Sequence, residues 1–179
     1  MGQRHRYAGP RSPDVLPFRG AGGVGLRVLI EEAVGDAVDG GIVDGAVGVQ
    51  VDVPASLATD IEAGALRRLL VPLVARAFAG ARRGAGPCRP EVVVTAVVCP
   101  DGVEIEVAAT GAPLDADDLA GFARHPGSQP VGRGTPWHAG LIRDAALLGG
   151  TLTARDCPEG GAAVTLHVPL GRAAGRRAA

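Results

Sequence analysis

The segment that most constrains the fold is "EVVVTAVVCPDGVEIEVAA", residues 91–109. Its first half is a nearly continuous apolar run. In its second half Val103, Ile105 and Val107 alternate with Glu104 and Glu106, and this period of two is typical of a strand with one buried face. The Pro-Asp-Gly triplet between the halves has the chemistry of a tight turn. The segment therefore predicts an antiparallel hairpin whose apolar face must be covered by other elements.

Helical and extended patterns surround this hairpin. Apolar residues at helical spacing predict helices over 25–39 and 62–83, and Pro72 is expected to kink the second. Alternating valines predict a strand over 47–53. A third helix is expected after Thr135 as N-cap and Pro136 at the first helical position, and it stops at a Gly-Gly pair. Residues 151–170 predict a second hairpin.

The order of these elements favours one fold class. Two hairpins interleaved with helices indicate an α+β two-layer sandwich, in which helices pack on one face of a mixed, mostly antiparallel sheet. At 179 residues the length favours a single domain. We place that domain at 25–170, after a flexible tail at 1–24 that is rich in Arg, Pro and Gly, and before a basic tail at 171–179.

Composition excludes several classes of function. All 18 basic residues are Arg, and the chain has no Lys and no Asn, so no Walker-type phosphate loop and no mechanism that needs either side chain can operate. A net charge of −1 and only five aromatic residues argue against nucleic acid as a partner. Three cysteines without a C-x-x-C pair favour free thiols over a zinc site.

The sequence also predicts where the protein resides. No run approaches the roughly 18 apolar residues of a membrane span, and the N-terminus lacks the apolar stretch of a secretion signal. Arg6 stands where a myristoylation signal requires Ser or Thr. We therefore expect a cytoplasmic protein without a membrane segment.

Several motifs have a structural and a functional interpretation. "GAGGVG" at 20–25 fits the dinucleotide fingerprint, but the segment before it contains two prolines and is a poor strand, so we expect no such site. His138 could contact a phosphate or act as a base, although we expect a half-exposed histidine at a helix end. Asp115, Asp117 and Asp118 could be a metal or acid/base cluster, although we expect them to cap a short helix.

Four stretches together resemble the histidine kinase-type ATPase family, the ATP-binding domain shared by sensor histidine kinases, gyrase-type topoisomerases and the heat-shock chaperone of ninety kilodaltons. They are "VQVDVPASLATDIEAGALRRLLVPLVARAFAGA", "VEIEVAATGAPLDADDLAGF", "GRGTPWHAGLIRDAALLGGTLTAR" and "EGGAAVTLHVPL". By resemblance they correspond to the family's Asn-bearing helix, adenine-binding box, glycine-rich phosphate lid and terminal hairpin. The resemblance implies the same α+β sandwich.

The departures from the family fall on residues that bind nucleotide. By resemblance, Arg76 occupies the position of the Asn that holds Mg²⁺, and Ala109 that of the Asp that binds the adenine amino group. Gly111 is retained, but Pro113 replaces the second glycine of the box. The lid keeps Gly132 and Gly134 without the full glycine run, and Pro136 lacks a backbone N–H at a helix start. The resemblance thus implies a vestigial nucleotide site formed by Arg76, Ala109, Gly111, Pro113, Gly132, Gly134 and His138.

These features favour a degenerate, non-catalytic signalling or interaction module related to two-component sensor kinases. We expect no catalytic residue, no bound metal and no cofactor, and a protein partner such as a response regulator or a kinase. The alternative is a divergent ATP-binding protein or phosphotransferase, with Arg76, Arg133 or His138 on the phosphates and Asp115 on Mg²⁺. A small-molecule binder in the same cleft also remains open.

Overall fold

The computed structural model describes residues 24–39, 47–84, 89–123, 137–158 and 160–169. Its elements are β1 (Val24–Gly25), α1 (Leu26–Ala37), β2 (Gly48–Asp52), β3 (Ala58–Thr59), α2 (Ala63–Arg83), β4 (Glu91–Cys99), β5 (Gly102–Ala109), α3 (Ala116–Phe122), α4 (Trp137–Leu147), β6 (Thr151–Asp156) and β7 (Ala162–Pro169).

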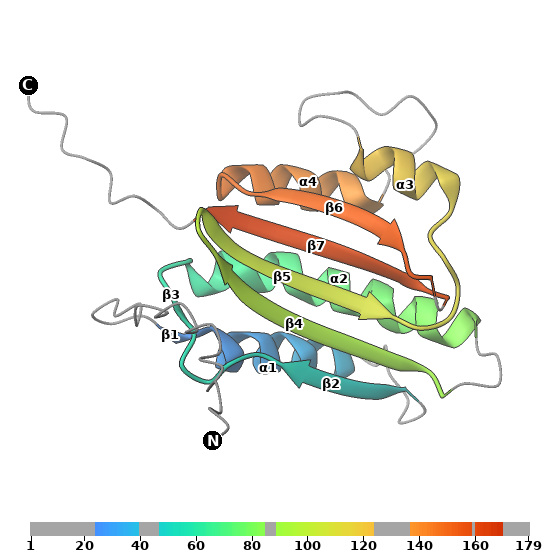
Figure 1. Ribbon diagram of the computed structural model, residues 1–179, viewed down its shortest axis with the longest axis horizontal. Coiled ribbons are helices and arrows are strands. Elements are labelled where there is room, and N and C mark those ends of the chain that lie inside the picture. Colours follow the sequence, from blue (N-terminus) through green and yellow to red (C-terminus); the bar gives the residue numbers. More distant parts are fainter. Residues whose placement is uncertain (1–23, 40–46, 85–88, 124–136, 159, 170–179) are drawn as a thin grey trace, which may run out of the picture.

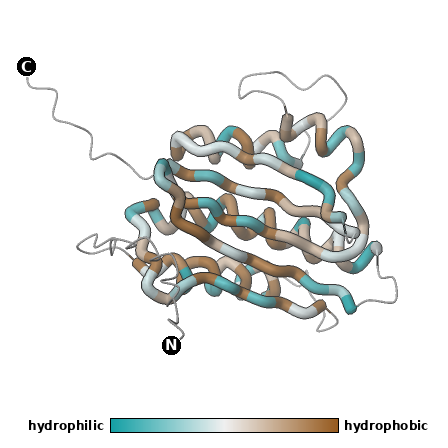
Figure 2. The backbone as a smooth tube through the Cα atoms, in the orientation of Figure 1, coloured by the Kyte–Doolittle hydropathy of each residue, from teal (hydrophilic) through white to brown (hydrophobic). Residues whose placement is uncertain are grey.

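Five strands form one sheet in the order β2-β4-β5-β7-β6, with β2 parallel to β4 and the other neighbours antiparallel. Helices α1, α2 and α4 lie behind this sheet, and among the described residues no helix covers its other face, as Figure 1 shows. The predicted α+β two-layer sandwich is therefore confirmed. Hydrophobic and hydrophilic residues alternate along β5 in Figure 2, which is the pattern of a strand with one covered face, whereas β4 is hydrophobic over most of its length.

The core lies between α1, α2 and the covered face of the sheet. The apolar residues at helical spacing in α1 are buried: Leu26, Leu29, Ile30, Ala33 and Ala37. Those of α2 are buried as well, apart from Ala77, which is partly buried: Leu66, Leu69, Leu70, Leu73 and Val74. Phe78 of α2 is fully buried in this core. Helix α2 is N-capped by Glu62, whose carboxylate accepts hydrogen bonds from the backbone of Gly64 and Ala65. It continues through Pro72 as a single helix, and the kink expected there stays a prediction.

The predicted hairpins are confirmed. Cys99 pairs with Gly102 across a two-residue turn, and β6 pairs with β7 from Thr151 to Asp156. The two-residue strands β1 and β3, which pair antiparallel, are not predicted because such short segments carry no periodicity. Helix α4 ends at Leu147, shortly before the Gly149-Gly150 pair, as expected, and Gly149 has a φ of 69°.

Other expectations lie outside the described residues: the GAGGVG glycines at 20–23, the lid glycines Gly132 and Gly134, and the N-cap Thr135 with Pro136. Within the described ranges, no helix combines the length and the apolar character needed to cross a membrane.

Candidate functional site

A pocket lies where α2 passes the end of β5 and the loop that follows it. It is lined by Leu73, Arg76, Ala77, Gly80, Arg83, Val107, Ala109, Ala112, Pro113, Leu114, Trp137, Ala162 and Val164. Its empty space is about 420 Å³ when the open mouth is counted. No side chain with a carboxylate or amide oxygen is among these lining residues.

The loop after β5 lies directly on the last turns of α2 and narrows the pocket. The backbone N–H of Ala112 donates to the carbonyl of Gly80 at 3.3 Å. Gly111 has a φ of 103°, and a Cβ there would lie 2.8 Å from the Gly80 carbonyl oxygen. Glycine is therefore required at 111 both by the backbone conformation and by the close approach to the helix.

The structure brings together part of the predicted site. Arg76, Ala109 and Pro113 line the pocket, and Gly111 lies in the loop beside it. His138 is not one of the lining residues.

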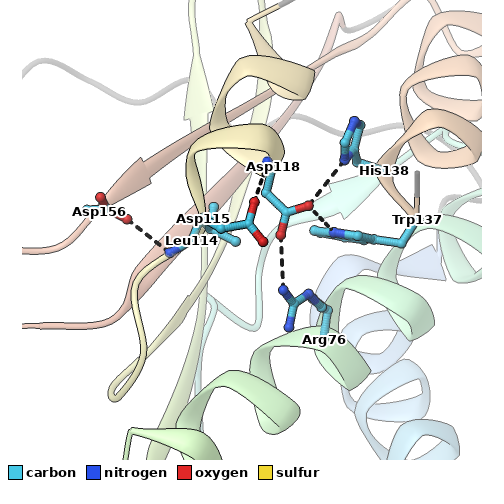
Figure 3. Close-up of polar contacts among 7 residues, drawn as sticks. All are labelled: Arg76, Leu114, Asp115, Asp118, Trp137, His138 and Asp156. Atoms are coloured by element: carbon cyan, nitrogen blue, oxygen red, sulfur yellow. Dashed lines mark hydrogen bonds and ion pairs between the residues drawn. The ribbon is translucent and has the colours of Figure 1, made fainter. Parts of the chain in front are cut away.

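Of the three acidic residues at the start of α3, Asp115 and Asp118 have different roles. Asp115 is the N-cap, as expected, and its carboxylate accepts a hydrogen bond from the backbone N–H of Asp118 at 2.7 Å. Asp117 is exposed in the first turn. The expectation that Asp118 is a third capping residue is wrong, because its side chain is buried and points toward α2 and α4, as Figure 3 shows.

The Asp118 carboxylate is the centre of a partly buried polar cluster, which we call the Asp118 cluster: Arg76, Asp118, Trp137 and His138. Arg76 Nη2 donates to Oδ2 at 3.0 Å, and Trp137 Nε1 donates to Oδ1 at 2.6 Å (Figure 3). The Asp118 side chain is 10% exposed and that of Arg76 is 26% exposed. The cluster therefore connects α2, α3 and α4 through one carboxylate, which accepts a charged donor on one oxygen and a neutral donor on the other.

Arg76 has a second partner in the same cluster. Its guanidinium carbon lies 5.3 Å from the centre of the Trp137 ring, within the range of a cation–π interaction. The positive charge of Arg76 thus interacts with the carboxylate of Asp118 and with the ring face of Trp137.

His138 differs from its sequence-based expectation. It is 5% exposed rather than half-exposed. The centre of its ring lies 5.3 Å from the ring centre of Phe122 and 5.8 Å from that of Trp137. Its Nδ1 is 3.5 Å from Asp118 Oδ1 without the geometry of a hydrogen bond. Gly121 packs so closely on the imidazole that a Cβ there would overlap it. The expectation fails because α3 covers this end of α4.

The Asp118 cluster was not found from the sequence, although one signal was available. Trp137 is the only tryptophan, and a buried indole N–H usually has an acceptor. Its acceptor Asp118 lies 19 residues away in another helix, whereas Asp144 is nearer in the sequence, so only the packing of α3 on α4 identifies Asp118 as that acceptor.

A separate hydrogen bond fixes the loop between β5 and α3. Asp156, the last residue of β6, accepts from the backbone N–H of Leu114 at 3.1 Å (Figure 3).

Across the described part of the chain, no group of three or more His, Cys, Asp or Glu side chains could hold a metal ion.

Comparison with known proteins gives a consistent result for the fold. No protein-family model and no curated protein sequence matches the chain. Among solved structures, the catalytic domain of histidine kinase ThkA superposes with a TM-score of 0.62 at 15% identity, covering 82% of this chain and 93% of that domain. The mycobacterial sensor histidine kinase MprB gives 0.60 at 15% identity, with coverages of 82% and 96%.

The ATP-binding domain of PrrB from Mycobacterium tuberculosis gives a TM-score of 0.60 at 23% identity, covering 83% of this chain and 96% of that one. At these identities the likeness concerns the fold. Together with the sheet order and the helical layer, it shows that the chain has the histidine kinase-like ATPase domain fold.

Proposed function

We propose that this chain is a degenerate histidine kinase-like ATPase domain that acts as a non-catalytic interaction module in signalling. The observation that carries the proposal is the ion pair between Arg76 and Asp118. By resemblance, Arg76 stands where the family has the Asn that holds Mg²⁺. Here that position carries a positive charge which is already paired inside the chain.

The residues around the pocket do not fit Mg²⁺ with ATP. Magnesium requires oxygen ligands, and the lining side chains offer none, whereas the Arg76 guanidinium would repel the cation. Asp118, the nearest carboxylate to Arg76, already accepts from two donors. We therefore assign no phosphoryl-transfer step and no cofactor to this protein.

The adenine side of the pocket supports the same proposal. Ala109 cannot accept the hydrogen bond that the family's Asp takes from the adenine amino group, and an unmet buried hydrogen bond costs about 1–3 kcal/mol, or about tenfold to a hundredfold in affinity. On the loop side, the backbone N–H of Ala112 donates to the carbonyl of Gly80 at 3.3 Å, which keeps the loop at Gly111 against α2.

An interaction role is the function that the folded domain can still perform if it does not bind nucleotide. The folded framework is intact, with a hydrophobic core on one side of the sheet and no described helix on the other. We propose a cytoplasmic protein partner in signalling, such as a response regulator or a kinase, recognised without nucleotide.

The test is calorimetric titration of ATP and of ADP into the purified chain, each with and without Mg²⁺, beside a catalytically competent histidine kinase domain as positive control. We expect no binding at millimolar nucleotide. Micromolar binding would refute the proposal and favour the alternative, a divergent ATP-binding protein of the same fold.

If binding is observed, the variant Ala109→Asp identifies its mode. An adenine in the family's orientation should bind about tenfold to a hundredfold more tightly once the acceptor is restored. Unchanged affinity would instead indicate a ligand that uses the pocket differently.

A further inference from the structure

The open face of the sheet is acidic. Residues of β4 and β5 alternate between the two faces, so Glu104 and Glu106 point away from the helices while Val103, Ile105 and Val107 are buried. In the register of the sheet, Asp52 of β2 pairs with Thr95, and Thr95 pairs with Glu106, which places the two carboxylates in one row across the open face.

Two further carboxylates extend this surface. Glu91 begins β4 on the same face, and Asp101 occupies the turn between β4 and β5 with 78% of its side chain exposed. The described arginines on this side are Arg155, which pairs with Glu106 at 3.0 Å, and Arg89, whose Nε lies near Gly48. We call the set Asp52, Glu91, Asp101, Glu104 and Glu106 the acidic face. The acidic face has five carboxylates, and the two described arginines on the same side leave three of these charges in excess.

The chain itself contains a segment of matching charge at a suitable position. Strand β7 ends at Pro169, which pairs with Gly102 beside the Asp101 turn. The residues that follow, "LGRAAGRRAA" at 170–179, lie outside the described part and contain three arginines and no acidic residue.

The distances allow contact. Glu104 lies two residues from Gly102 along β5, or about 7 Å at the rise of a strand. Arg172 follows Pro169 by three residues, and a chain extends by at most about 3.3–3.6 Å per residue, so its backbone can lie up to about 10 Å away. Arg176 and Arg177 can reach further, across β4 to Asp52.

We propose that the C-terminal segment 170–179 docks its three arginines on the acidic face of its own sheet. A short connection to β7 presents these arginines at millimolar effective concentration, so pairs that are individually weak can be occupied. Because the face is exposed to solvent, the attraction is screened by salt. This inference is independent of the state of the nucleotide pocket.

The proposal predicts a specific signature in ¹H–¹⁵N spectra of the full chain. We expect the triple variant Arg172→Gln, Arg176→Gln, Arg177→Gln to shift the amide signals of Glu104, Glu106 and their neighbours in β4 and β7. At about 1 M salt, where the Debye length falls to about 3 Å, the difference between variant and wild type should disappear. The matched control removes three arginines from the other end of the chain, Arg4→Gln, Arg6→Gln and Arg11→Gln, and should leave these signals unchanged.

Three outcomes would overturn the proposal. The C-terminal variant could leave the acidic face unshifted, or the N-terminal control could produce the larger shifts. Shifts that grow with protein concentration would place the arginines of a second copy on the face instead. Support requires shifts that depend on the C-terminal arginines, are independent of concentration and are lost in the variant Asp52→Asn, Glu104→Gln.

Discussion

The variant Asp118→Asn tests whether the Asp118 cluster holds three helices together. The substitution preserves size and leaves the backbone N–H of Asp118, which caps α3 through Asp115, in place. It removes the negative charge that pairs with Arg76. The amide oxygen of the new side chain can serve only one of the two donors, so either Arg76 or Trp137 loses its acceptor.

The expected loss follows from the burial of the pair. Removing one partner of a fully buried ion pair costs about 3–5 kcal/mol. Because the Arg76 side chain is 26% exposed, it can regain part of its hydration, which lowers the estimate. An unsatisfied buried donor costs about 1–3 kcal/mol. We expect Asp118→Asn to lower the free energy of unfolding by about 2–3 kcal/mol, or the Tm by about 4–12 °C at this chain length.

The assay is urea unfolding followed by circular dichroism, with Asp117→Asn as the matched control. Asp117 belongs to the same turn but is exposed, so its variant should change stability by less than about 0.5 kcal/mol. A double-mutant cycle with Arg76→Met should give a coupling energy of about 1–3 kcal/mol. If Asp118→Asn is as stable as Asp117→Asn, the cluster does not stabilise the fold and our reasoning fails.

Three further predictions concern packing and thiol chemistry. Gly121→Ala should destabilise the chain by about 1–3 kcal/mol because its methyl overlaps a buried imidazole, whereas Gly140→Ala, with nothing within 4 Å of the new Cβ, should be neutral or stabilising in the same unfolding assay. Phe78→Ala should cost about 3–5 kcal/mol in urea unfolding, and a loss below about 1 kcal/mol would contradict its place in the core. Desolvation, together with the carboxylates of Glu104 and Asp101, raises the pKa of the Cys99 thiol. In a chain whose other two cysteines are serine, alkylation by iodoacetamide should therefore follow a pH profile displaced to higher pH than that of free cysteine. Glu104→Gln should move the profile part of the way back, because desolvation and Asp101 remain.

Much of the fold could be predicted because the relevant signals are local. The alternation in 103–107 gives the hairpin its buried face, and the stripe from Leu66 to Val74 gives α2 its core contact. These periods arise from the geometry of single elements. The pairing of β2 with β4 is different, because it joins segments about forty residues apart and is parallel, and no turn specifies it.

The sequence by itself determined which residue types are present. The chain has no Lys and no Asn, and Ala109 and Arg76 stand at positions that the resemblance assigns to nucleotide binding. The loss of nucleotide binding stays a prediction. Only the tertiary structure decided what Arg76 does instead. Its partner Asp118 is 42 residues away on another helix, and Trp137 is further still. Burial of a charge depends on which elements pack around it, and that depends on the whole fold.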